Sequence, residues 1–250
     1  DAHESLTLMA AAAGKPVYVE KPMGRSHAEC LRMIGACSGA GVELFVAYYR
    51  RRLPKFMKVK ELIDGGAIGP VRSVELVLHA ALASASGGGE IPWRLRPEIA
   101  GPGGHLVDLG THQLDLFHYL IAPVQSAART SVYPAEGLPI PDRISARLEL
   151  AGGIPVEADW RFDAKAEQRI DRITISGDAG TIVFSVFDDV PLTLTTPAGD
   201  QSFTLPNPPF VQAPMIQAVT SALLGREPNP CDGATGALAN QAIEWILGLQ

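Results

Sequence analysis

The sequence predicts two segments of different fold class, an α/β segment followed by a larger α+β segment. Over the first 65 or so residues helical and strand-like patterns alternate, which implies a parallel sheet with crossover helices. Between residues 125 and 205 short strand patterns follow one another with turn signals between them, which implies a large, mostly antiparallel open sheet. The character changes near residues 66–70, so we expect domains at 1–66 and 67–250.

In the first segment, apolar periodicity and capping residues define each element in turn. We expect a helix over residues 4–13, a short buried strand over 17–19, a helix over 27–39, a strand over 42–47 and a helix over 53–64. Ser26 followed by Glu29 is a capping-box pattern at the start of the second helix. Gly41 and Gly66 stand where the second and third helices should end.

The second segment should begin with a long strand over residues 71–78 and a loop over 80–102 that carries Trp93 and Arg94. A loop of this length in a compact domain is often functional. We then expect a helix over 104–121, strands over 125–133, 142–150, 154–162, 169–176, 180–186, 191–196 and 201–205, and two closing helices over roughly 210–224 and 232–248. Gly152-Gly153 and Asp178-Ala179-Gly180 are hairpin signals.

Composition and charge limit the class of protein. The 250 residues are 46% hydrophobic and 19% charged, which is typical of a globular protein with a sizeable core. A net charge of −6 without a Lys/Arg stripe argues against a nucleic-acid partner, and the absence of an apolar run of about 18 residues argues against a membrane span. Cys30, Cys37 and Cys231 have no CxxC or zinc spacing, so we expect core residues in a cytoplasmic, reducing compartment.

The stretch from Gly103 to Asp115 contains candidates for proton transfer. Positions i, i+4 and i+7 of a helix share one face, so Asp108, His112 and Asp115 should point the same way. A carboxylate beside an imidazole forms a general acid–base pair, because an unperturbed imidazole titrates near pH 6.5. Lys21 follows the short strand over 17–19, at the carboxyl end of a parallel strand, where open α/β sheets bind ligands. Its ammonium could donate to a substrate oxygen as negative charge develops there.

A metal site is the chemical alternative for the same helix. Asp108, His112 and Asp115 would supply oxygen and nitrogen ligands at helical spacing, and a hydrolase or isomerase could use them. No second cluster in the sequence offers the remaining ligands, and Lys21 would have no role in such a site. We therefore expect no metal.

Four stretches of the sequence form a recognisable set. They are GKPVYVEKP at residues 14–22, VAYYRR at 46–51, IDGGAIGPV at 63–71, and Trp93-Arg94 followed by the glycines of 101–104 and by Asp108, His112 and Asp115. Together they resemble the glucose–fructose oxidoreductase, inositol dehydrogenase and MocA (Gfo/Idh/MocA) family of nicotinamide-dependent sugar and polyol dehydrogenases. The resemblance covers nearly the whole chain, and the Glu-Lys-Pro turn combined with the Asp-x-x-x-His spacing makes it specific.

The resemblance implies hydride transfer between NAD or NADP and a hydroxyl-bearing carbon of a sugar, polyol or related compound. It implies Lys21, Asp108 and His112 as catalytic residues that also bind substrate, with Arg94 as a further substrate contact. The residues expected to contact the cofactor are Glu20, Lys21, Pro22 and Tyr48, and Pro22 is expected to follow a cis peptide bond. A homo-oligomer is expected through the open sheet, because a large sheet with an uncovered face usually needs a partner.

The sequence departs from the family pattern at the phosphate-binding loop. No Gly-x-Gly-x-x-Gly occurs in the 250 residues, although in doubly wound dinucleotide folds that loop holds the pyrophosphate with backbone amides. We interpret residues 1–66 as the C-terminal remnant of a Rossmann-type sheet, and the chain as a fragment of the full enzyme that need not be active by itself. The alternative is a non-catalytic protein that dimerises through its sheet or binds a ligand, and that has lost its cofactor.

Overall fold

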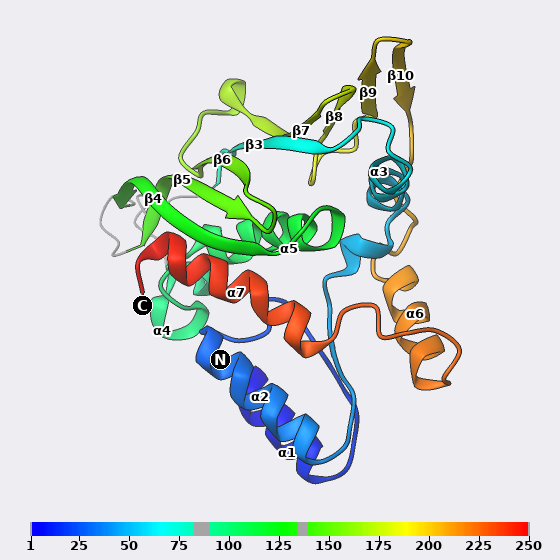
Figure 1. The fold of residues 1–250 in the computed structure, drawn as a ribbon. Helices are drawn as coiled ribbons and strands as arrows, with labels where there is room; N and C mark the ends of the chain where they lie inside the picture. The colour runs from blue at the N-terminus through cyan, green and yellow to red at the C-terminus, as the bar shows by residue number, and fades with distance from the viewer. Residues whose placement is uncertain (1, 83–90, 135–139, 250) are drawn as a thin grey trace.

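The computed structural model contains both predicted kinds of sheet (Figure 1). It describes residues 2–82, 91–134 and 140–249, and within them a two-stranded sheet and an eight-stranded sheet are present. The predicted fold class is confirmed. Much of the predicted loop over 80–102, at residues 83–90, lies outside the described residues.

The small sheet pairs β1 (Val17–Val19) with β2 (Leu44–Val46) in parallel, as predicted. Helix α1 (His3–Ala12) precedes β1, and α2 (His27–Gly39) forms the crossover to β2. The Ser26 side chain accepts a hydrogen bond from the Glu29 amide at 3.2 Å, which caps α2 as predicted. The Glu29 carboxylate, however, accepts from the amide of Arg25 at 2.8 Å, so it reaches one residue further back than in a standard capping box.

The large sheet has the strand order β10-β9-β8-β7-β3-β6-β5-β4. Its strands are β3 (Val71–His79), β4 (Val124–Pro134), β5 (Pro141–Leu150), β6 (Ile154–Arg161), β7 (Ile170–Gly177), β8 (Gly180–Phe184), β9 (Leu192–Thr196) and β10 (Gly199–Phe203). Apart from their ends, they agree with the predicted ranges. Neighbours are antiparallel except β3 and β6, which run parallel with Val74 opposite Val156.

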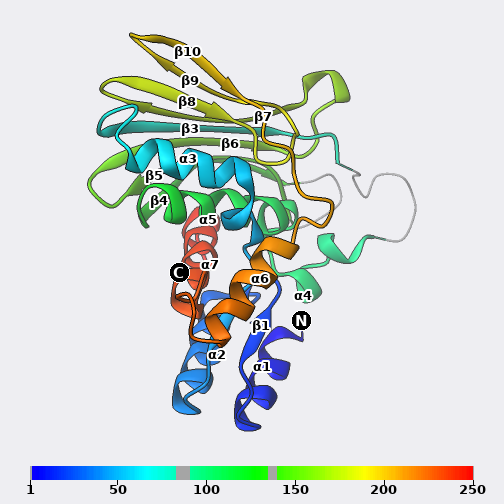
Figure 2. The same cartoon turned by 90° about the vertical axis from the view of Figure 1, so that its right-hand side faces the viewer.

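Helices cover one face of the large sheet (Figure 2). The layer includes α3 (Pro54–Asp64), α5 (Thr111–Leu120) and α7 (Gly233–Leu247), and α6 (Ala213–Leu223) lies below α3 near β1. Side chains on the covered face, such as Trp160 and Ile173, are fully buried. The Trp160 indole donates to the Gln113 side chain at 2.7 Å and so fixes α5 to the sheet.

The predicted helix over residues 104–121 is present, but its first part is π-helical rather than α-helical. Residues Leu106–Gly110 form a π-helix, η4, and the α-helix begins only at Thr111. Each π turn holds one more residue than an α turn, so the side chains before it are rotated relative to the α-helix that follows. Consequently Asp108 and Asp115 bond to different partners, whereas the unbroken helix predicted a shared face.

The C-terminal part of the chain returns to the small sheet, which the sequence did not predict. The Val46 amide donates to the Cys231 carbonyl at 2.9 Å, and Phe45 forms a bridge with Asp232. Helix α7 then passes between α2 and the large sheet (Figure 1). A side chain at Gly236 would lie 2.5 Å from a methyl of Val46, so only glycine permits this approach. The boundary at residues 66–67 stays a prediction.

All three cysteines are buried and free, as expected for core residues. The described part of the chain holds no helix with both the length and the apolar character needed to cross a membrane.

A buried ion pair joins the short helix η1 (Tyr49–Arg52) to α5. Arg51 and Asp115 are 5% and 1% exposed, and Arg51 donates to both carboxylate oxygens at 2.6 and 3.0 Å. Arg51 also donates to the Pro230 carbonyl at 3.4 Å, so its guanidinium joins η1 to two other parts of the chain, α5 and the segment before α7. Asp115 therefore braces the helix and is not available to a ligand.

Replacing Asp115 with Ala should lower the free energy of unfolding by about 3–5 kcal/mol, because it leaves the buried Arg51 cation unpaired. Urea unfolding monitored by circular dichroism measures the change. The matched control is Asp64→Ala, which removes an exposed pair with Lys60 and should cost under about 0.5 kcal/mol. Equal losses in the two variants would show that the Arg51 pair is not a central brace.

Candidate active site

A cavity of about 460 Å³ lies at the carboxyl end of β1. Five of the predicted site residues line it: Glu20, Lys21, Pro22, Arg94 and Asp108. Its volume is typical of small-molecule sites, and its position is where open parallel sheets bind ligands. The structure therefore brings residues of both sequence segments to one place.

The Lys21 ammonium is held by a single residue of the π-helix. It donates to the Asp108 carboxylate at 2.9 Å and to the Asp108 backbone carbonyl at 2.7 Å. The bond between Lys21 and Pro22 is cis, as the resemblance implied. Only 13% of the Lys21 side chain is exposed. Solvent therefore screens the ammonium charge only weakly at the cavity wall.

Arg94 holds the second oxygen of the same carboxylate. It lies in the short helix η3 (Trp93–Leu95), its Nε donates to Asp108 Oδ2 at 3.1 Å, and its guanidinium stacks on the Trp93 ring. Asp108 thus bridges Lys21 and Arg94 and sets the distance between the two cations. Both remain partly free to meet a ligand, because each is a multiple donor.

The His112 side chain is surrounded by aromatic rings. Its imidazole is 4% exposed and meets the rings of Tyr48, Tyr49 and Phe187 edge-on at 6.3, 5.5 and 6.1 Å. Burial, with smaller contributions from the Lys21 and Arg50 cations, holds the pKa of His112 well below its usual value. The ring is therefore neutral at pH 7 and able to accept a proton. It is not among the residues that line the cavity, and its catalytic role stays a prediction.

Two predicted cofactor contacts differ in their exposure. Glu20 is exposed at the cavity, and its carboxylate accepts a hydrogen bond at 3.0 Å from Gln212, just before α6. Tyr48 is fully buried and does not line the cavity. Its ring packs edge-on against the His112 ring. A cofactor contact by Tyr48 therefore stays a prediction, and this packing does not support it.

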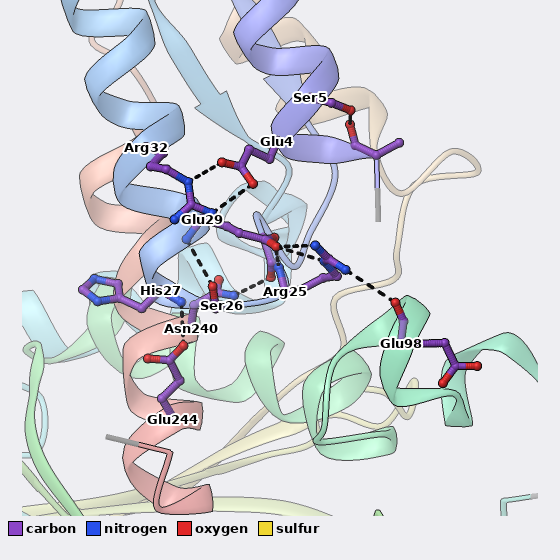
Figure 3. Close-up of polar contacts among 12 residues, drawn as sticks. Glu4, Ser5, Arg25, Ser26, His27, Glu29, Arg32, Glu98, Asn240 and Glu244 are labelled. Carbon is purple, nitrogen blue, oxygen red and sulfur yellow. Dashed lines mark hydrogen bonds and ion pairs between the residues drawn. The ribbon is translucent and has the colours of Figure 1, made fainter.

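The far wall of the cavity contains two residues that sequence reasoning missed, Arg25 and Glu29. Figure 3 shows Arg25 between the Glu29 carboxylate, which it contacts at 2.7 and 3.0 Å, and the backbone carbonyl of Glu98 on α4 (Pro97–Ala100). On the other side of this region, Glu244 of α7 accepts from the His27 amide at 2.7 Å. The Ser26–Glu29 capping pattern was the available signal, but it indicated only a helix start.

The charges along the cavity balance. Three cations line it, Lys21, Arg25 and Arg94, and so do three carboxylates, Glu20, Glu29 and Asp108. Alternating donors and acceptors of zero net charge suit a neutral ligand with several hydroxyl groups. Among the residues that the structure describes, no group of three or more His, Cys, Asp or Glu side chains is placed to hold a metal ion.

The cavity also fits the nicotinamide end of a dinucleotide. A flat aromatic amide needs an apolar wall with polar groups at its rim. Pro22, Ile99 and Val107 provide apolar surface, and Glu20 and Lys21 provide the polar rim. These residues could contact only the nicotinamide end of the dinucleotide. The Gly-x-Gly-x-x-Gly loop that would hold the diphosphate does not occur in this sequence.

Comparison with known proteins gives one family. Residues 56–183 match the model of the GFO/IDH/MocA C-terminal domain. Oxidoreductase P35 of Formosa agariphila is 31% identical over 247 residues, which are 98% of this chain and 75% of that protein. Levoglucosan dehydrogenase of Pseudarthrobacter phenanthrenivorans is 26% identical over 206 residues, 73% of this chain, and the match spans about half (52%) of that relative.

Solved structures with the same fold cover the chain almost completely. The aldose–aldose oxidoreductase from Caulobacter crescentus, complexed with glycerol, superposes with a TM-score of 0.83 at 26% identity over 99% of this chain and 73% of that one. A levoglucosan dehydrogenase in complex with NADH and levoglucosan gives 0.81 at 21% identity over 100% and 76% of the two chains. The second likeness concerns the fold alone.

Acid should destabilise the fold through two buried histidines. Burial, with a smaller contribution from Arg51, lowers the pKa of His118 to about 3, and the pKa of His112 is lowered as well. The unfolded histidine titrates near 6.5, so between these values the unfolded state binds more protons and stability falls as the pH falls. His118 should contribute a slope of about 1.4 kcal/mol per pH unit in that window, and His112 should contribute a slope of the same sign.

The variant His118→Leu should lose one such contribution to the slope between about pH 6 and pH 4. Urea unfolding at a series of pH values measures it, with His27→Asn, at a partly exposed histidine, as the control. An unchanged pH slope in His118→Leu would contradict the assignment.

Proposed function

The chain belongs to the Gfo/Idh/MocA family, and on that premise we propose that it forms the substrate side of an NAD(P)-dependent dehydrogenase. The reaction is hydride transfer between the nicotinamide and a hydroxyl-bearing carbon of a sugar, polyol or related compound. The observation that carries the proposal is the contact of Lys21 with both the carboxylate and the carbonyl of Asp108 at the cavity. Names of relatives in both comparisons support the same reaction class.

In this proposal the protein positions the carbinol and manages its proton. The nicotinamide, when bound, takes up or gives back the hydride. Lys21 donates a hydrogen bond to the substrate oxygen and stabilises the negative charge that develops there. Asp108 holds the ammonium in place through its carboxylate and carbonyl, and with Arg94 it binds a neighbouring hydroxyl.

His112 accepts the hydroxyl proton during oxidation and returns it during reduction. Its Nδ1 is buried without a hydrogen-bond partner, so we assign the transfer to Nε2. A neutral imidazole is the form that oxidation requires, and burial supplies it at pH 7.

The substrate class follows from the charge balance. A cavity with three cations and three carboxylates favours a neutral polyhydroxy compound over a sugar acid or a phosphate. The relatives act on or hold such compounds by name: levoglucosan, an aldose and glycerol. The choice between NAD and NADP is left open by this proposal.

The same proposal includes a homo-oligomer and a cytoplasmic location. Ion pairs such as Arg147–Glu157 and Arg172–Glu75 cover the open face of the large sheet, and a second copy can provide matching charges. A monomer in sedimentation equilibrium would contradict the oligomer. Free, buried cysteines support a reducing compartment, and a disulfide in the isolated protein would contradict it.

Replacing His112 with Asn should lower kcat by about 10²–10⁴-fold while the fold is retained, because the proton acceptor is lost. NAD(P)H absorbance during oxidation of levoglucosan, aldoses and glycerol measures turnover, and circular dichroism monitors the fold. His27→Asn is the matched control and should keep full activity. Unchanged turnover in His112→Asn would remove His112 from the mechanism.

Fluorescence titration of the natural full-length protein with NADH and NADPH separates the proposal from the non-catalytic alternative. If that protein binds neither dinucleotide and turns over no substrate, while it still dimerises, the alternative is the better account. Saturable binding together with turnover supports the dehydrogenase.

A further inference from the structure

A loop from the large sheet reaches the imidazole of His112. The loop, residues 185–188, follows β8, and its Phe187 ring meets the His112 ring edge-on at 6.1 Å. The Arg50 guanidinium lies 4.7 Å from the Phe187 ring centre, and its Nη1 donates to the Val186 carbonyl at 2.6 Å. The loop and Arg50 therefore enclose the His112 imidazole from one side.

The amides of this loop converge on one buried carboxylate. Asp171 of β7 is 9% exposed and accepts hydrogen bonds from the amides of Phe187, Asp188 and Val186 at 2.5, 3.0 and 3.2 Å. It also accepts from the Ser185 hydroxyl. A carboxylate that satisfies this many donors fixes a short loop in one conformation.

The carbonyls of the same loop converge on one buried ammonium. Lys55 of α3 is 3% exposed, and its Nζ donates to the carbonyls of Asp188 at 2.7 Å and Ser185 at 3.4 Å. The pKa of Lys55 is lowered, chiefly because the ammonium is buried. Burying two charges is costly, and here both are placed where they hold a short connection between strands, a kind of segment that is usually mobile. The arrangement thus implies that the placement of this loop matters.

We propose that Asp171 and Lys55 are positioning residues, which clamp residues 185–188 so that Phe187 and Arg50 keep the His112 imidazole enclosed and in one orientation. The importance of this clamp for catalysis rests on the proposed function, whereas the contacts that form the clamp are a property of this chain.

Several groups face His112 from the elements packed against it. The charged ones are Lys21 after β1 and Arg50 of η1, and the aromatic ones are Tyr48, Tyr49 and Phe187. Because burial is the largest cause of its low pKa, releasing the loop should rehydrate the ring and raise that pKa.

The variant Asp171→Asn separates the clamp from a plain charge effect. Removing a negative charge, with no movement of the loop, would lower the pKa of His112 further. Releasing the loop would raise the same pKa toward its ordinary value of about 6.5. The two explanations predict shifts of opposite sign.

Imidazole NMR of the 250-residue chain measures the shift, with the His112 signals assigned by His112→Asn. In the wild type we expect the His112 midpoint to lie well below the ordinary imidazole value of about 6.5. In Asp171→Asn the midpoint should rise toward that value. Phe187→Leu removes the ring without a charge change and should produce the same rise. Asp200→Asn makes the same change at an exposed carboxylate of β10, is the matched control and should behave as wild type.

A folded Asp171→Asn whose His112 midpoint is unchanged or lower would overturn the proposal, as would an equal rise in Asp200→Asn. If Asp171→Asn does not fold, Phe187→Leu decides, because a midpoint as low as wild type would show that the loop does not enclose the ring. The readout needs neither substrate nor dinucleotide, so its failure is distinct from a failure of the dehydrogenase proposal.

Discussion

The contact between the Lys21 ammonium and Asp108 is the interaction on which the site depends. The two residues are 87 positions apart, one following a strand of the small sheet and the other in the π-helix that precedes α5. The π-helix presents both the carboxylate and the backbone carbonyl of Asp108 to the same ammonium. The contact therefore joins the turn after β1 to the helix that carries His112 and holds a cation at the cavity wall.

The remaining packing keeps this contact in place. The buried Arg51–Asp115 pair anchors α5 to η1, and the Trp160–Gln113 hydrogen bond anchors it to the large sheet. Buried ion pairs contribute little net stability against an apolar replacement, and they are best understood as fixing one arrangement among several. Here the arrangement fixed is that of α5, which carries His112.

Much of the fold was predictable from local patterns. The period-2 strands and the glycines at hairpins and helix ends gave nearly all element ranges, because each of these signals lies within a few residues. The break at Leu106–Gly110 was not predictable, since a π-helix depends on tertiary contacts such as those of Asp108 with Lys21 and Arg94. Lys21, Arg94 and Asp108 were predicted as one site from a motif set. Arg25, Gln212 and the Asp171 clamp were missed because their partners are either backbone groups or distant in sequence.

The central claim is that Lys21 and Asp108 act as one unit in hydride transfer, and a double-mutant cycle tests it most directly. Turnover of the best polyol substrate would be compared in Lys21→Met, Asp108→Asn and the double variant. Residues that act through one another are strongly non-additive, so the double variant should lose hardly more kcat than the worse single variant. A loss equal to the product of the two single losses would contradict the account.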